Sequence, residues 1–416
     1  MQSLKITRSV YIILILIFFS RSLVYLGLPS ILNQIHFIFV IFFMYYLVIN
    51  SLKKDKLLYL IFLYSLVVLI SGIINSSSFS NIIIYILITS EPFLIFYIFS
   101  NYNLKKNEVD FFRKIIFFVT FLNLFLMYYQ YFFLGLRNDE VRGVFLNLGA
   151  GAHITAAINT LLAFYLWISP KFTYKVFNYL IIVLLLTSNF LSDAKQNILT
   201  FGSAFIIYFI YDSIKRKKFF PILQIVIYLI IFYFFINYLS NHTNLLSEYQ
   251  IRSLEDIIDG FRTKLVVYDL ITSNFNDVYN YFFGLGPGST TSRLARMIPD
   301  YMHLPFLNLT GTNLTNEIFI FQQSNYVTAT GTGSSIFSLF FFWASIFGDV
   351  GLISIFIYIY IWIYILKKNN YNSFIFMLIA LLFVKGFIFD WPEEPIFTTM
   401  LISIIVLRMY ENISNP

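Results

Sequence analysis

The residues best suited to bind an anion in this chain are arginines that lie between or beside its hydrophobic runs. Ten of the 28 lysines and arginines fall outside the short basic connections between these runs, and seven of the ten are arginine. They are Arg21, Arg137, Arg142, Lys195, Arg252, Arg262, Lys264, Arg293, Arg296 and Lys385. A planar guanidinium can give two parallel hydrogen bonds to a phosphate or a carboxylate, whereas lysine suffices as a point charge. The pattern indicates a site for an anionic ligand, although pairing with acidic residues of the same segment explains any single arginine equally well.

Several of these cations lie in a polar segment of about 95 residues, between positions 239 and 335. Ser253 and Asp256 form a capping box, and apolar residues follow at helical spacing, so we expect an amphipathic helix from Ser253 to about Ile271. Arg262 and Lys264 project from its other faces. A glycine-rich turn follows over residues 284–288.

The sequence lacks the motifs that metal-dependent and nucleotide-dependent mechanisms require. Cysteine is absent, the four histidines are scattered, and no zinc-protease or phosphate-binding-loop motif occurs. We expect no metal and no cofactor. His303, in the polar segment, is the candidate general base, although a lone histidine is more often structural.

Composition places the chain in a membrane. Hydrophobic residues make up 59% and charged residues only 12%, whereas soluble domains carry about 25% charged residues. The net charge of +7 comes from short patches between hydrophobic runs, which orient a chain in a bilayer and do not indicate nucleic-acid binding. The first run is long enough to be a signal anchor.

The hydrophobic runs predict an all-α polytopic membrane protein with about twelve transmembrane helices. Spans one to nine occupy residues 1–239, a large external loop with helical segments occupies 240–335, and spans ten to twelve occupy 336–416. The twelve runs lie near 9–27, 31–50, 57–75, 81–100, 111–136, 147–168, 176–191, 197–213, 219–239, 346–366, 372–390 and 396–409.

The positive charges predict the orientation of these spans. With the N-terminus inside, 18 of the 28 cations fall in cytoplasmic connections, and fourteen of those 18 are lysine. Lysine and arginine of short loops collect on the cytoplasmic side. We therefore expect both termini in the cytoplasm and the large loop outside.

The order of these features resembles the O-antigen polymerase (Wzy) family, within the O-antigen polymerase and ligase superfamily. The resemblance covers most of the chain in architecture and a few short motifs in residues. The matching motifs are Arg142-Gly143-Val144-Phe145, Ser192-Asp193-Ala194-Lys195, Arg262 with Tyr268 and the turn Gly284-Leu285-Gly286-Pro287-Gly288, and Gly348-Asp349-Val350-Gly351.

The resemblance implies a GT-C-like bundle in the bacterial inner membrane that joins undecaprenyl-diphosphate-linked repeat units at the outer face. The enzyme would be a metal-independent glycosyltransferase that stabilises the departing diphosphate and positions two lipid-linked substrates. Its implied partners are these lipid-linked glycans, the bilayer and a chain-length regulator protein. We expect His303 and Arg262 to act in catalysis. The residues expected to bind the diphosphate are Arg142, Lys195, Arg262, Arg293 and Arg296.

Two other functions stay open. An O-antigen ligase is the nearer one, but Phe337 and Ser338 stand where ligases of this superfamily carry a histidine and its neighbour. A lipid-linked oligosaccharide flippase is the alternative of another class, since it too is a basic membrane protein of about twelve spans. Flippases do not need a loop of this size.

Overall fold

The computed structural model describes ten stretches of the 416-residue chain. They are residues 2–34, 36–37, 40–41, 55–101, 104–145, 150–171, 174–217, 254–301, 309–322 and 338–414. Every regular element in these stretches is a helix.

The N-terminal half contributes helices that alternate with short connections. They are α1 (Gln2–Tyr25), η1 (Ser30–Gln34), α3 (Lys56–Ile74), α4 (Phe79–Asn101), α5 (Lys106–Phe132), η2 (Asn138–Glu140), α6 (Ala150–Ile168), α7 (Lys175–Leu191) and α8 (Lys195–Arg216).

The C-terminal half contributes shorter helices and then three long ones. They are α10 (Leu254–Ser273), α11 (Val278–Phe283), α12 (Arg293–Tyr301), α13 (Asn313–Gln322), α14 (Phe342–Lys368), α15 (Ser373–Ile388), η5 (Trp391–Glu393) and α16 (Pro395–Ser414).

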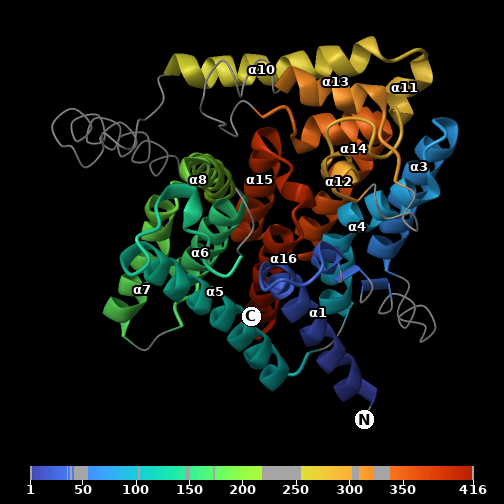
Figure 1. Ribbon diagram of the computed structural model, residues 1–416. Helices are drawn as coiled ribbons and strands as arrows, with labels where there is room; N and C mark the ends of the chain where they lie inside the picture. Colours follow the sequence, from blue (N-terminus) through green and yellow to red (C-terminus); the bar gives the residue numbers. More distant parts are fainter. Residues whose placement is uncertain are drawn as a thin grey trace.

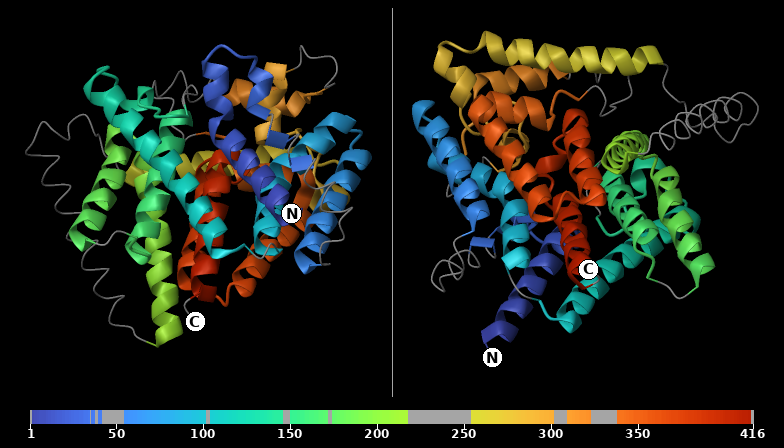
Figure 2. Two further views of the ribbon diagram at one scale, coloured as in Figure 1. Left: turned by 90° about the horizontal axis from the view of Figure 1, so that it is seen from below. Right: turned by 180° about the vertical axis from the view of Figure 1, so that it is seen from behind.

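The long helices form a bundle with the C-terminal helices in the middle. α14, α15 and α16 lie between α5 to α8 on one side and α3 and α4 on the other (Figures 1 and 2). α16 packs against α4, α5 and α6, and its central residues Ile402, Ile404 and Ile405 are fully buried. α10 lies across one end of the bundle, whereas both chain termini lie at the opposite end (Figure 1).

Five of the described helices are long and apolar enough to cross a membrane. They are Lys56–Ile74, Phe79–Ser100, Gly151–Ile168, Gln196–Arg216 and Phe342–Lys368. Three shorter apolar helices accompany them, at Leu14–Tyr25, Lys175–Leu191 and Ser373–Ile388. The structure therefore has the helices of a membrane protein, while the full set of twelve spans stays a prediction.

The predicted span near 31–50 lies largely outside the described residues, and the one near 219–239 lies wholly outside them. Within the first, Ser30–Gln34 is a 3-10 helix rather than the start of an α-helix. Gly27, with a φ of 92°, and Pro29 separate this segment from α1, because neither residue continues a regular helix.

The helix expected over residues 253–271 is observed as α10. Val267 and Ile271 on its inner face are buried, and the Tyr268 ring packs edge-on against Phe341. Arg262 and Leu265 face outward, with the Leu265 side chain largely exposed. The face of α10 that lies on the bundle also carries Thr263 and Lys264, so the expectation that Lys264 projects from another face is wrong, and Leu265 of the expected apolar stripe lies on the exposed side.

The glycine-rich turn that follows α11 docks on a break in α14. The backbone N–H of Leu285 donates to Gly348 O (2.7 Å), and that of Gly286 donates to Asp349 O (2.9 Å). α14 is interrupted at Gly351, whose φ of 78° and ψ of −178° are not helical. A Cβ at Gly284 would clash with the backbone of Asp349, and one at Gly351 would clash with the backbone of Phe282. The two backbones approach this closely only because glycine occupies both positions.

We expect Gly284→Ala to destabilise the protein by more than about 2 kcal/mol, because the new Cβ meets rigid backbone in a conformation that only glycine adopts readily. The thermal unfolding midpoint of the purified protein in detergent measures this. Gly135→Ala is the matched control, since Gly135 has the same φ of 69° but nothing within 4 Å of its Cβ position. The control should lose only about 1 kcal/mol, the cost of backbone strain alone. Equal losses in the two variants would show that the docking contact contributes nothing.

Candidate functional site

The turn that leads into α12 is fixed by one buried carboxylate. Asp349 accepts hydrogen bonds from the Gly288 N–H (2.8 Å), the Thr290 N–H (2.8 Å) and the Thr290 hydroxyl (2.6 Å). Asp349 itself is completely buried. Buried carboxylates are stabilised by such donors. The start of α12 is therefore held in a fixed position relative to α14.

Neighbouring helices bind the same turn from the other side. The Asn75 side chain donates to Gly284 O (3.2 Å), and the Asn81 side chain donates to Pro287 O (3.1 Å). Asn75 follows α3 and Asn81 lies in the first turn of α4. Three long helices thus position the turn, and α12 with it.

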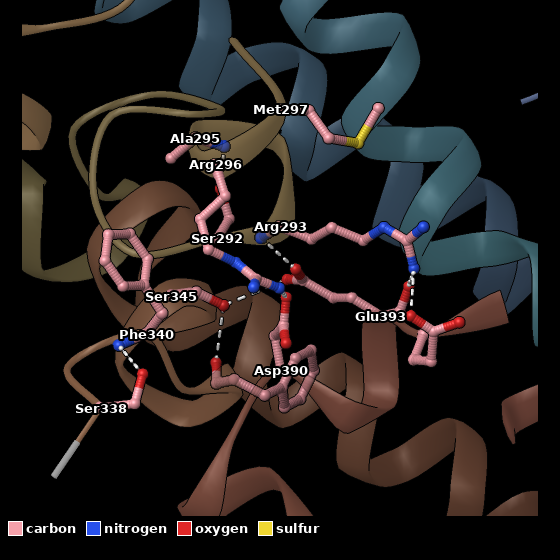
Figure 3. A network of polar contacts seen from close by, with 12 residues as sticks. Ser292, Arg293, Ala295, Arg296, Met297, Ser338, Phe340, Ser345, Asp390 and Glu393 are labelled. Carbon is pink, nitrogen blue, oxygen red and sulfur yellow. Dashed lines mark hydrogen bonds and ion pairs between the residues drawn. The ribbon is translucent and has the colours of Figure 1, made fainter. Parts of the chain in front are cut away.

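α12 directs two arginines toward the segment between α15 and α16 (Figure 3). The Arg293 guanidinium donates to Glu394 Oε2 (2.9 Å) and to Glu393 O (2.9 Å). The backbone N–H of Arg293 donates to Glu393 Oε2 (2.5 Å). Arg296 forms an ion pair with Asp390, and its guanidinium lies 4.4 Å from the centre of the Phe389 ring.

A third arginine reaches the same carboxylates from the N-terminal helix. The Arg21 guanidinium of α1 donates to Glu394 Oε2 (2.5 Å). Only 8% of the Arg21 side chain is exposed, and 11% of the Arg293 side chain. Arg21 and Arg293 therefore share one carboxylate although they lie far apart in the sequence. We call Arg21, Arg293, Arg296, Asp390, Glu393 and Glu394 the arginine cluster.

The two glutamates of the arginine cluster have opposite pKa shifts. Burial and, to a smaller extent, the neighbouring Asp390 charge raise the pKa of Glu393 to about 8. Burial also raises the pKa of Glu394, but the charges of Arg21 and Arg293 outweigh this effect and hold the pKa below its usual value. At neutral pH the three guanidinium groups therefore face two carboxylates, those of Asp390 and Glu394, and one positive charge is in surplus.

The arginine cluster also contains polar atoms without a hydrogen-bond partner among the described residues. They are the guanidinium atoms Nη1 of Arg21 and Nε of Arg296 and the carboxylate oxygen Oε1 of Glu394, all buried. A buried donor left without an acceptor costs free energy comparable to a lost hydrogen bond. Guanidinium N–H groups without an acceptor, in a site with net positive charge, could bind a phosphate or diphosphate.

α10 is attached next to the arginine cluster by a buried lysine. The Lys264 ammonium donates to Ser338 O (2.7 Å) and Ile388 O (3.0 Å), and it lies 4.9 Å from the centre of the Phe341 ring. Ile388 directly precedes Phe389 and Asp390. Burial lowers the pKa of Lys264 to about 7. The helix of the polar segment is thereby held over the end of the bundle that carries the cluster.

Arg142 belongs to a second polar region, around η2, α6 and the start of α8. Its guanidinium donates to Asp139 O (2.9 Å), and its backbone O accepts from the Thr155 hydroxyl (2.5 Å). His153 on α6 lies 3.8 Å from a carboxylate oxygen of Asp139, and its backbone O accepts from the Asn197 side chain (2.9 Å).

The two polar regions are connected through Lys385 of α15. The Lys385 ammonium donates to the Asn197 side-chain oxygen and lies 3.9 Å from the centre of the Trp391 ring. Trp391 begins η5, which also carries Glu393. Lys385 itself is fully buried.

The structure brings some of the predicted binding residues together and separates others. Arg293 and Arg296 lie in the arginine cluster, whereas Arg142 lies in the second region. Arg262 lies outside both groups, since its side chain is 75% exposed and pairs with Asp259 of the same helix (3.1 Å). The Lys195 side chain and all of His303 lie outside the described residues; the backbone of Lys195 begins α8.

Sequence reasoning missed the acidic half of the arginine cluster. Asp390, Glu393 and Glu394 follow one hydrophobic run and precede the next, and three carboxyl groups within five residues at a span boundary were the available signal. Arg21 is one of the ten cations outside the basic connections, but nothing in the sequence indicates that it meets Arg293. Glu91, another charge within a run, pairs with His36 (2.7 Å) in a separate buried contact.

The fold and these contacts define an all-helical protein with membrane-type helices and a buried, arginine-rich polar site near one end of the bundle. No protein-family model matches the chain, and comparison with characterised proteins finds no significant relative.

We expect the pH dependence of the protein's stability to show whether Glu393 is protonated in the folded state. The folded protein holds this proton up to about pH 8, whereas the unfolded chain releases it near 4.5. The contribution of Glu393 to stability is therefore fully present below about pH 4.5 and is lost as pH rises toward 8. Glu393→Gln keeps a neutral side chain at every pH. The Tm of wild type minus the Tm of the variant should therefore decrease as the pH is raised from 5 to 8. Thermal unfolding at a series of pH values, in steps of about half a unit, measures this.

Glu394→Gln is the matched control for this measurement, because the pKa of Glu394 is shifted in the opposite direction. The Tm difference between wild type and Glu394→Gln should change only at pH values below the ordinary pKa of a glutamate carboxyl group. Parallel pH profiles for wild type and Glu393→Gln would contradict the assignment of a neutral Glu393.

Proposed function

We propose that this protein is a glycosyltransferase that polymerises undecaprenyl-diphosphate-linked oligosaccharide repeat units into O-antigen or a related surface polysaccharide. It acts without a metal or cofactor at the outer face of the bacterial inner membrane. The activated donor carries its own leaving group, so the protein has to stabilise the departing diphosphate and position the acceptor hydroxyl.

The arginine cluster carries this proposal. Arg21, Arg293 and Arg296 converge from α1 and α12, and two of their buried nitrogen atoms, Nη1 of Arg21 and Nε of Arg296, have no acceptor among the described residues. Three guanidinium groups beside two ionised carboxylates leave a positive surplus for an anion. A diphosphate that gains negative charge as it leaves the sugar would be stabilised more in the transition state than in the ground state.

Contacts at the opposite end of the bundle support the proposed orientation. The Lys368 ammonium pairs with Asp55 (2.6 Å), Arg113 pairs with Glu411 (3.5 Å), and Lys215 donates to Tyr371 O (2.8 Å). These contacts join basic connections that the positive-inside rule assigns to the cytoplasm. With that end inside, α10 and the arginine cluster lie at or near the outer face. The complete proposal keeps twelve spans, a periplasmic loop over 240–335 and both termini in the cytoplasm.

His303 remains our candidate base for the acceptor hydroxyl. Glu393 cannot take this role at neutral pH, because burial and the Asp390 charge raise its pKa to about 8 and keep it protonated. Its carboxyl group accepts hydrogen bonds from the Ser345 hydroxyl (3.1 Å) and the Arg293 backbone N–H but, among the described residues, from no guanidinium.

We expect Arg293→Ala to abolish polymerisation while the protein still inserts into the membrane. The loss of one charge-assisted contact to the diphosphate should lower the rate by about a hundredfold or more. The assay is a gel of surface glycans from a strain in which the variant replaces the wild-type gene; single repeat units on lipid A are the expected product. Arg113→Ala is the matched control, since Arg113 is a half-buried, ion-paired arginine at the other end of the bundle.

Deletion of the gene separates the rival functions in the same assay. Full-length chains left on the carrier would indicate a ligase, and a complete absence of surface glycan would indicate a flippase. Either result would replace the polymerase proposal.

The predicted roles of Arg142 and Arg262 are tested in the same strain. We expect Arg142→Ala and Arg262→Ala each to yield single repeat units, because both arginines are predicted to contact the diphosphate. Arg216→Ala is the control for Arg262, since Arg216 is also an exposed arginine that pairs with an acid on its own helix. Wild-type glycan lengths in either variant would remove that residue from the site.

A further inference from the structure

Helix α11 has its polar and apolar faces reversed relative to a helix of a water-soluble domain. Val278, Tyr281 and Phe282 lie on one face at helical spacing, and their side chains are 74%, 43% and 46% exposed. Asn280 lies on the opposite side of the helix and is buried. A surface helix in water normally buries its apolar face and exposes its polar one. We call Val278, Tyr281 and Phe282 the anchor face, which is suited to surroundings less polar than water.

Contacts within the chain hold α11 in this orientation. The Asn280 side chain donates to Gly284 O (3.0 Å), and its oxygen accepts from two backbone N–H groups at the start of the helix (3.1 Å each). The Tyr281 ring packs edge-on against Phe275 at a centroid distance of 4.9 Å, and Phe275 packs against Phe347 of α14 at 5.5 Å. Because the polar side is satisfied inside the protein, the anchor face is directed outward by the fold itself.

The anchor face continues the exposed apolar surface of α3. α3 is one of the described helices long and apolar enough to cross a membrane, and it carries no charged residue after Lys56. Its exposed apolar residues include Phe62 near the middle and Ile73 and Ile74 at the end. α11 contacts α3 (Figure 1), and Asn75, directly after α3, donates to the carbonyl that directly follows α11. α11 therefore lies where the lipid-facing surface of α3 ends.

The residue types of α11 suit the boundary between lipid and water. Its sequence, VYNYFF, contains two tyrosines, two phenylalanines and no charge. Tyrosine is enriched at this boundary, because its ring enters the apolar region while its hydroxyl group stays in contact with water. A second copy of the chain fits less well, since a protein interface of standard size takes about 20–30 residues a side, whereas α11 has six residues.

We propose that α11 is an interfacial membrane anchor, which inserts the anchor face into the lipid leaflet at the α10 end of the bundle. Interfacial helices bury their apolar face about 5–10 Å into the boundary between headgroups and acyl chains. The anchor fixes the depth of the glycine-rich turn over 284–288, and of α12 after it, relative to the membrane surface. The polar segment is thus partly embedded in the bilayer and not wholly external. This inference does not depend on the proposed function.

The test measures the depth of single spin labels, which the absence of cysteine from the sequence makes straightforward. Val278→Cys and Tyr281→Cys carry the label on the anchor face. Phe62→Cys is the lipid control, and Asp269→Cys, on the exposed side of α10, is the water control. The full-length protein is reconstituted in vesicles of phosphatidylethanolamine and phosphatidylglycerol. Electron paramagnetic resonance then measures how often each label collides with oxygen, which concentrates in lipid, and with a water-soluble nickel chelate.

The labels at Val278 and Tyr281 should collide with oxygen several-fold more often, and with the nickel chelate several-fold less often, than the label at Asp269. Their depth should be about 5–10 Å, shallower than that of the Phe62 label. Nickel accessibility equal to that of the Asp269 label would overturn the proposal. Low accessibility to both reagents, with spin–spin broadening that disappears on dilution with unlabelled protein, would also overturn it, because a second copy of the chain would then cover the face.

A charge on the anchor face gives a second test. Val278→Asp changes a side chain that is largely exposed, so the fold should persist, and an unchanged depth of the Phe62 label in this background verifies that. The Tyr281 label should become several-fold more accessible to the nickel chelate, because a carboxylate favours water over lipid. Leu265→Asp is the matched control, since Leu265 is also exposed and apolar but lies on α10; it should leave the Tyr281 label unchanged. An unchanged Tyr281 label in Val278→Asp would contradict insertion of the anchor face.

Discussion

The constraint on which this structure depends is that charge buried among apolar helices must be compensated. Arg21 and Arg293 share the carboxylate of Glu394, and Arg296 pairs with Asp390. These contacts tie α1, α12 and the segment between α15 and α16 into one unit, because removing one partner of a buried ion pair leaves an uncompensated charge and costs about 3–5 kcal/mol. Compensation is incomplete: with Glu393 neutral at pH 7, the cluster keeps a positive surplus. That surplus makes the site suitable for an anionic substrate.

The positions of the arginines depend in turn on the glycine-rich turn before α12. Gly284 and Gly351 let the turn approach the interrupted helix α14, and Asp349 then binds the turn through three hydrogen bonds. The geometry of the charged groups is therefore set by backbone contacts that no charge pattern reveals. In the proposed reaction this rigidity would place the guanidinium groups before the diphosphate arrives, so that little reorganisation is needed.

Several features could be predicted from the sequence because they depend on local patterns. The amphipathic spacing after Ser253 predicts the helix observed as α10, and the hydrophobic runs predict the long apolar helices α3, α4, α6, α8 and α14. The tendency of Arg293 and Arg296 to occupy a polar site followed from their residue type. Their partners could not be predicted in this way, since Glu394 lies about 100 residues from Arg293 and more than 370 from Arg21.

The sequence by itself determined that the chain forms apolar helices, that its lysines gather in short connections, and that no cysteine is present. Those properties depend on composition and short-range spacing. Only the tertiary structure decided that Arg293 and Arg296 meet Arg21, that Arg262 faces outward, and that Lys385 is buried without a counter-charge. Long-range ion pairs are set by how helices pack, and packing depends on the shapes of many side chains at once, so the pairing of charges becomes visible only when the helices are in place.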